Sequence, residues 1–187
     1  TTYSGTISMQ CSGSTDADND MITYEIWKGQ ISNTSNEWID LSATDAGNWA
    51  GTSEVFSVSY DSVNNLVWTG IEMGKFGYYN ISSGVWVNLS ATDAGNWAGT
   101  SEVFSVSYDS VNNLVWTGIG GGKFGYYNIS SGVWVDLSAT DTANWVGTDY
   151  LLSVDYDATN NLVWTGIQMG KFGYYNISSG VWVDLSA

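Results

Sequence analysis

Tryptophans are the first residues in this sequence whose type and spacing point to a chemistry. Trp49, Trp97 and Trp145 recur at intervals of 48 residues, each in a stretch of glycine, alanine, threonine and aspartate. The flat apolar face of tryptophan stacks on sugar rings, so the pattern suggests one carbohydrate site per copy. Trp68 and Trp86 recur as well, but they lie in apolar segments, where large rings usually fill a core. We expect these two to pack between structural units.

Asparagines in the N-x-S/T pattern suggest a second chemistry, the attachment of glycans outside the cell. The pattern occurs at Asn33, Asn80, Asn88, Asn128 and Asn176. Three of these head the same "NIS" phrase in successive copies, so they are one observation repeated. Asparagine and serine are also common turn residues, which leaves a purely structural interpretation open.

Carboxylates suggest a third chemistry. Asp16, Asp18 and Asp20 have the alternating spacing of a calcium loop, whose oxygen ligands suit Ca²⁺, but no glutamate follows at the twelfth position of an EF-hand. A solvated acidic turn is therefore the alternative, and Ca²⁺ is the only cofactor that the sequence suggests. Asp45 and Asp61 recur in the copies without an obvious partner. We expect them to act as surface charge.

The cations of the repeated part are Lys75, Lys123 and Lys171. They recur in register, so each is expected to pair with an acid of a neighbouring copy. Surface ion pairs of this kind contribute little, about 0 to 1 kcal/mol.

Composition excludes several functions. The chain has 187 residues, a net charge of -15, no histidine and a single cysteine, Cys11. Zinc sites, Ser-His-Asp and Cys-His nucleophiles and internal disulfides each lack a necessary member. The acidic balance would repel a nucleic acid backbone, and no apolar run is long enough to span a membrane. We expect neither an enzyme nor a nucleic-acid-binding protein.

The elements that must position these residues belong to a sequence repeat with three copies. Residues 41–88 and 89–136 differ at three positions, and residues 137–184 follow the same text with changes clustered at 142–159. Residues 185–187 begin a further copy or end a closing strand. Because no insertion interrupts the period, each copy is expected to build the same supersecondary unit.

Each copy is predicted to form four antiparallel strands. In the first copy, Val55–Asp61 alternates apolar residues with serine, as a strand with two different faces does. The turn formers D-S-V-N-N follow, and then three more strands are expected at Leu66–Ile71, Lys75–Asn80 and Val85–Leu89. The short turns between them favour antiparallel hairpins. The fold class is therefore all-β, with one four-stranded sheet per copy.

A four-stranded sheet of about 45 residues, apolar on both faces, is the unit of a β-propeller blade, because its neighbours cover both sides. The phrase SVSYDSVNNLVWTGIEMGKFGYYNISSGVWVNL resembles the blade repeats of two-component-regulator-type and Kelch-like propellers. The resemblance covers residues 41–187 and implies a β-propeller-type array with a 48-residue repeat. It implies no single function, because such blades serve binding, scaffolding and enzymatic proteins alike.

Residues 1–40 are different. The phrase EWIDL at 37–41 mimics VWVNL at 85–89, which suggests a degenerate blade. The phrase CSGSTDADNDMITYEIW is similar to the S-T-D-x-D-x-D loop of PKD-like and other immunoglobulin-like modules of secreted proteins. The segment is thus either a degenerate blade or the remnant of an immunoglobulin-like module.

These observations favour an extracellular structural or adhesive repeat protein located at the cell surface. The acidic composition and the glycosylation patterns agree with a surface glycoprotein. An array that leaves a blade unpaired exposes a sheet edge, so we expect a homo-oligomer, filament or layer. The alternative is a glycan-binding, lectin-like β-propeller with one site per blade at the Trp49-type residues.

Overall fold

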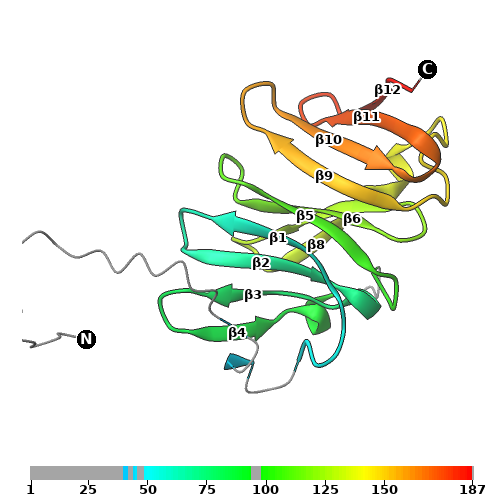
Figure 1. The fold of residues 1–187 in the computed structure, drawn as a ribbon. Coiled ribbons are helices and arrows are strands. Elements are labelled where there is room, and N and C mark those ends of the chain that lie inside the picture. Colours follow the sequence, from blue (N-terminus) through cyan, green and yellow to red (C-terminus); the bar gives the residue numbers. More distant parts are fainter. Residues whose placement is uncertain (1–39, 42–43, 46–48, 94–97, 187) are drawn as a thin grey trace, which may run out of the picture. The chain divides into compact units, whose positions relative to one another are not determined.

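The computed structural model describes residues 40–41, 44–45, 49–93 and 98–186. Within these ranges the chain forms three separate four-stranded antiparallel sheets linked by turns and short 3-10 segments (Figure 1). The predicted all-β fold class is confirmed. No helix in the described part of the chain has the length and hydropathy needed to cross a membrane.

Each sheet is a meander in which successive strands pair. Sheet I contains β1 (Val55–Asp61), β2 (Leu66–Ile71), β3 (Phe76–Asn80) and β4 (Val85–Asn88). Sheet II contains β5 (Val103–Asp109), β6 (Leu114–Ile119), β7 (Lys123–Asn128) and β8 (Val133–Asp136). Sheet III contains β9 (Leu151–Asp157), β10 (Leu162–Ile167), β11 (Lys171–Asn176) and β12 (Val181–Asp184). The four strands predicted for the first copy are confirmed to within one residue at each end.

The turn after the first strand shows why the sequence folds this way. Asp61 lies opposite Leu66 in the ladder, and its carboxylate accepts hydrogen bonds from the backbone N–H groups of Val63 and Asn64 at 3.0 and 2.8 Å. Asn65 has a φ of 57°, in the left-handed region that asparagine tolerates. The aspartate and the asparagine together close the hairpin.

Four 3-10 segments follow strands of the sheets. Their bounds are Glu72–Gly74, Ser90–Thr92, Ser138–Thr140 and Gln168–Gly170. The hydroxyl of Ser90 accepts a hydrogen bond from the backbone N–H of Phe76 at 3.0 Å, which ties the segment after β4 to the third strand. The chain then passes to the next sheet.

The core consists of two apolar layers between successive sheets. Trp68 and Phe76 of sheet I pack against Val103, Val106 and Tyr127 of sheet II. The equivalent residues of sheets II and III form the second layer, and the first strands β1, β5 and β9 lie next to one another (Figure 1). We call the side of a sheet that carries its Trp68 and Phe76 positions the front face, and the opposite side the back face.

Candidate functional site

Hydrogen bonds between the first strands connect one sheet to the next. The hydroxyl oxygens of Ser57 and Ser59 accept hydrogen bonds from the backbone N–H groups of Val106 and Tyr108 at 3.1 and 2.9 Å. Ser105 and Ser107 accept equivalent bonds from sheet III; their lengths are 2.9 Å from Val154 N–H and 3.0 Å from Tyr156 N–H. Serines on the front face therefore set the register of the following sheet.

A buried carboxylate completes each junction. Asp61 is 0% exposed, and it accepts hydrogen bonds from the Trp68 indole at 3.3 Å and from the Tyr108 hydroxyl of sheet II. Burial first, and then the charge of Asp61, raise the pKa of Tyr108 to about 12, and Asp109 acts in the same way on Tyr156. The prediction that Asp61 is surface charge is wrong, because the next sheet covers it and five donors converge on its two oxygens.

The back face of sheet I lacks such a cover among the described residues. Val55, Val58 and Tyr60 are 48%, 62% and 57% exposed, whereas the equivalent Val103 and Val106 are 0% and 4% exposed. The side chains are identical, so only the presence of a neighbouring sheet distinguishes the two environments. This back face therefore exposes several large apolar side chains side by side, and contiguous apolar surface of this kind can mark an interaction site.

The front face of sheet III is uncovered in the complementary way. Phe172 is 49% exposed, whereas Phe76 and Phe124 are 1% and 0% exposed. Trp164 is half-buried, whereas Trp116 is 1% exposed. The two outer sheets therefore present opposite faces, each lined with residues that are buried at the internal junctions.

A glycine in each second strand lets the next sheet approach. A Cβ atom added at Gly70 would lie 2.5 Å from the carbonyl oxygen of Val103, and one at Gly118 would lie 2.8 Å from that of Leu151. At Gly166 the nearest atom is the Cβ of Ser153 at 3.5 Å, an ordinary contact. Gly166 is thus the one member of this set with room for a methyl group.

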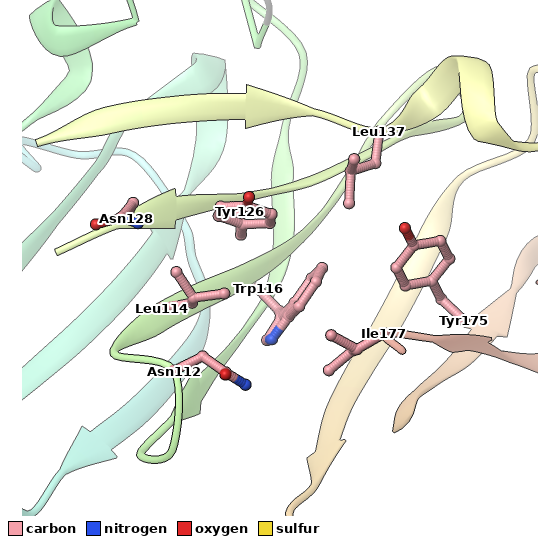
Figure 2. Close-up of a pocket in the computed structure, with 8 residues that line it drawn as sticks. All are labelled: Asn112, Leu114, Trp116, Tyr126, Asn128, Leu137, Tyr175 and Ile177. Atoms are coloured by element: carbon pink, nitrogen blue, oxygen red, sulfur yellow. The ribbon is translucent and has the colours of Figure 1, made fainter. Parts of the chain in front are cut away.

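A cavity of about 340 Å³ lies at the junction of sheets II and III (Figure 2). Asn112, Leu114, Trp116, Tyr126 and Asn128 line it from sheet II. Leu137, Tyr175 and Ile177 complete the lining. Burial and the neighbouring Tyr126 raise the pKa of Tyr175. Aromatic rings beside amide side chains form a surface suited to a polar ring such as a sugar.

Two of the predicted carbohydrate tryptophans, Trp49 and Trp145, do not line this cavity. Trp49 is half-buried, packs beside Trp86 with ring centroids 6.0 Å apart, and lies so close to Gly77 that a Cβ there would be 2.9 Å from its ring. Trp145 occupies the same position near Trp182 at 5.8 Å. The indole N–H groups of Trp49 and Trp145 are buried without a hydrogen-bond partner. Trp97 lies outside the described residues.

The predicted glycosylation residues fall at turns and strand ends. Asn80, Asn128 and Asn176 end β3, β7 and β11, and the side-chain Oδ1 of each accepts a hydrogen bond of 3.0 Å from the backbone N–H of the third residue that follows. Asn88 ends β4 and is exposed, and Asn33 lies outside the described residues. These contacts support turns, so the prediction of glycans stays a prediction.

The calcium prediction falls on Asp16, Asp18 and Asp20, which lie outside the described residues. Within the described ranges, no group of three or more His, Cys, Asp or Glu side chains could hold a metal ion. Asp45 is half-buried rather than a free surface charge, since its carboxylate accepts a hydrogen bond from the backbone N–H of Ala50 at 2.9 Å.

The lysines bind within their own copies rather than to the neighbouring copy. Lys171 forms an ion pair with Asp149, and Lys75 donates to the carbonyl oxygen of Ala50 and the hydroxyl of Ser53 at 3.3 and 2.9 Å. These partners belong to the linker that precedes the first strand of the same copy. The lysine follows the turn after the second strand, which brings it beside that linker.

Two features of the site were missed by sequence reasoning. The first is the junction set of serine, aspartate and tyrosine, and the second is the cavity lined by Tyr126, Tyr175 and Asn112. All of these residue types recur every 48 residues, and that recurrence was the available signal. The recurrence alone does not show which residues of neighbouring sheets are in contact.

No family model and no curated protein matches this sequence. Among solved structures, the chain is similar to a crystal structure of RRP9 WD40 repeats, with a TM-score of 0.57 and 9% identity over 73% of this chain and 39% of that one. It is similar to the structure of U3-55K to the same degree, with a TM-score of 0.57 and 10% identity over 73% and 40% of the two chains. The three sheets are β-propeller blades. The chain spans about two fifths of the length of these WD40 structures, and the Kelch-like, two-component-regulator and PKD-like resemblances stay predictions.

Proposed function

We propose that this chain is a structural repeat protein that binds further blades at the back face of sheet I and the front face of sheet III. One observation carries the proposal. Residues that are at most 5% exposed at the internal junctions, such as Val106, Val154 and Phe124, are 49% to 62% exposed at their counterparts Val58 and Phe172. Burial of such residues is favourable by about 1.5 to 3 kcal/mol each. The role is non-enzymatic.

The chemistry of the partner follows from the internal junctions. In the single chain the Tyr60 hydroxyl donates to the side-chain oxygen of Asn65 at 3.2 Å, at an exposed position. A partner for the back face of sheet I must offer a flat apolar surface, hydroxyl or carboxylate acceptors for the N–H groups of Val58 and Tyr60, and a carboxylate that replaces Asn65 as the acceptor of the Tyr60 hydroxyl. A blade front face has all three features. The uncovered surface is a sheet face, so association is by stacking rather than by strand pairing at an edge.

An extracellular, adhesive setting is part of the proposal. It is supported by the net charge of -15 and by the N-x-S/T patterns at Asn80, Asn128 and Asn176, which recur at the same turn of every blade. Glycopeptide mass spectrometry of the chain secreted from a eukaryotic host tests this part. We expect glycan on at least one of the three turns, and bare asparagine at all of them contradicts the glycoprotein assignment.

A lengthened chain tests whether the faces accept a further blade. The lengthened chain carries a second copy of residues 89–136 between Asp184 and residues 185–187. The free energy of unfolding is measured for the original and the lengthened chain, each with and without the substitution Phe172→Ala. In the lengthened chain, Phe172→Ala is expected to cost about 3 to 5 kcal/mol, as for a buried phenylalanine, and clearly less in the original chain. Equal costs in the two chains contradict the proposed function.

The cavity of Figure 2 favours carbohydrate binding as a second candidate function. Its aromatic rings offer stacking surfaces, and Asn112 and Asn128 offer amide donors and acceptors. A glycan array with the wild-type chain and Asn112→Ala tests it, with Asn160→Ala as the matched control. Asn112 and Asn160 donate the same turn hydrogen bond, of 2.8 and 2.7 Å, to Asp109 and Asp157, but only Asn112 lines the cavity. Binding lost in Asn112→Ala alone supports this function, and an array without a hit contradicts it.

A further inference from the structure

We propose that the partner is a second copy of this chain, joined head to tail, with the front face of sheet III in one copy stacked on the back face of sheet I in the next. The inference rests on the proposed function and names its partner. It takes the two internal junctions as the pattern of the junction between chains, because both uncovered faces carry the residues of those junctions.

The back face of sheet I repeats the residues that sheet II uses at its own junction. Val58, Tyr60 and Tyr79 occupy the repeat positions of Val106, Tyr108 and Tyr127 in sheet II. In the internal junction the Tyr127 ring packs at centroid distances of 5.9 Å from Trp68 and 5.6 Å from Phe76 of the preceding sheet. Tyr79 is half-buried in sheet I, with no preceding sheet among the described residues to contact.

The front face of sheet III is already arranged to receive that tyrosine. Trp164 and Phe172 stack at 5.6 Å and 11°, as Trp68 and Phe76 do at 5.6 Å and 20°. The pair therefore has its junction geometry before any partner arrives. Tyr79 of a second copy would pack on it with no rearrangement of either sheet.

Polar groups on the two faces are complementary as well. Ser153 of sheet III occupies the position of Ser57 and Ser105, and its hydroxyl can accept from the Val58 N–H of the next copy. Asp157 occupies the position of Asp61 and Asp109, which accept the tyrosine hydroxyl of the following sheet. Hydrogen bonds from Asn160 lower the pKa of Asp157, so it is an ionised acceptor at neutral pH.

One junction residue differs in sheet III. Asp155 replaces the serine found at positions 59 and 107. The hydroxyls of those serines accept hydrogen bonds from the backbone N–H groups of Tyr108 and Tyr156 in the next sheet. A carboxylate accepts the same N–H bond and does so more strongly. The open face thus keeps an acceptor at every position that the internal junctions use.

The charges favour head-to-tail over like-to-like contact. Two front faces placed together would bring Asp155 and Asp157 of both copies into one interface, which like-charge repulsion disfavours. Two back faces placed together would leave both Tyr60 hydroxyls without the aspartate that tyrosines 108 and 156 have. Only front against back reproduces the internal pattern.

Two variants, one on each face, test the inference. Gly166→Ala adds a methyl group that fits the single chain but would meet the Val55 carbonyl of the next copy, as a Cβ at Gly118 would meet Leu151. Val58→Asp places a carboxylate where the equivalent Val106 is 4% exposed. Association of each variant and of their equimolar mixture is measured by sedimentation velocity at 0.15 M salt, where repulsion between acidic chains is screened.

The wild-type chain is expected to associate, and each variant alone to associate about tenfold or more weakly. The mixture is expected to give a two-chain complex, because Val58→Asp keeps an intact front face and Gly166→Ala an intact back face. Circular dichroism confirms that both variants are folded, and Tyr60→Phe, which removes only a hydroxyl, replaces Val58→Asp if that variant unfolds.

Three outcomes overturn the inference. They are a wild-type chain that stays single at all concentrations, a variant that associates like the wild type, and a mixture that forms no complex. The lengthened chain then shows separately whether the proposed function stands, because its additional blade is covalently attached and needs no second copy.

Discussion

Sheet II and the two outer sheets have almost the same sequence but different surroundings. Val106 is 4% exposed in sheet II and Val58 is 62% exposed in sheet I, and Phe124 and Phe172 differ in the same way between sheets II and III. In these two pairs, the exposure of the side chain is therefore set by whether a neighbouring sheet is present, not by the residue type. Each outer residue serves as an internal control for its buried counterpart.

The largest expected difference concerns tryptophan. Trp116→Ala is expected to lower the free energy of unfolding by about 3 to 5 kcal/mol, because Trp116 is 1% exposed between two sheets. Trp164→Ala is expected to cost roughly half as much, since its ring has a sheet on one side only. Urea unfolding at low protein concentration, where chains are separate, measures both values. Equal costs would mean that sheet III is covered by another part of the chain.

The junction aspartates give the next largest effect. Asp109→Ala leaves the Trp116 indole, the Asn112 amide and the Tyr156 hydroxyl without their acceptor, and is expected to cost about 3 kcal/mol. Asp157→Ala is expected to cost less, because water can replace the carboxylate at the uncovered face. Denaturant unfolding of both variants checks the order, and Asp109→Asn, which keeps one acceptor oxygen, is expected to fall between Asp109→Ala and the wild type.

Two equivalent glycines, Gly118 and Gly166, allow the covered and uncovered faces to be compared by the addition of a single methyl group. Gly118→Ala is expected to cost about 1 to 3 kcal/mol, because its Cβ would lie 2.8 Å from the Leu151 carbonyl oxygen. Gly166→Ala in a single chain has only an ordinary contact at 3.5 Å and is expected to be close to neutral. Thermal unfolding of the two variants distinguishes them, and a large loss for Gly166→Ala would contradict an uncovered front face.

The smallest expected effect appears at high pH. The pKa of Tyr108 and Tyr156 is raised to about 12 by burial and then by Asp61 and Asp109, against 10.0 for an ordinary tyrosine. The folded chain holds these protons more tightly, so their contribution to stability is complete below pH 10 and is lost as the pH rises towards 12. Unfolding measured from pH 8 to 12 should show this loss, and Tyr108→Phe with Tyr156→Phe should reduce it. A slope unchanged in the double variant would contradict the tyrosine–aspartate contact.

The strands were predictable from the sequence because their causes are local. Alternation along Val55–Asp61 and the turn formers that follow determine where β1 and β2 begin and end, and the structure confirms both. The Asp61 environment was not predictable, because atoms that bury it belong to sheet II, where Tyr108 lies 47 residues further along the chain. The cavity between sheets II and III escaped prediction for the same reason. Local patterns specify a blade, and contacts between blades specify the site.

The repeated junction has a consequence for the gene that encodes this chain. The two internal junctions are built from the same recurring residues, so unequal recombination between copies can delete or duplicate one whole 48-residue unit and keep the same kind of junction. A shorter or longer product would need no compensating substitution. The number of units can therefore change in a single genetic event.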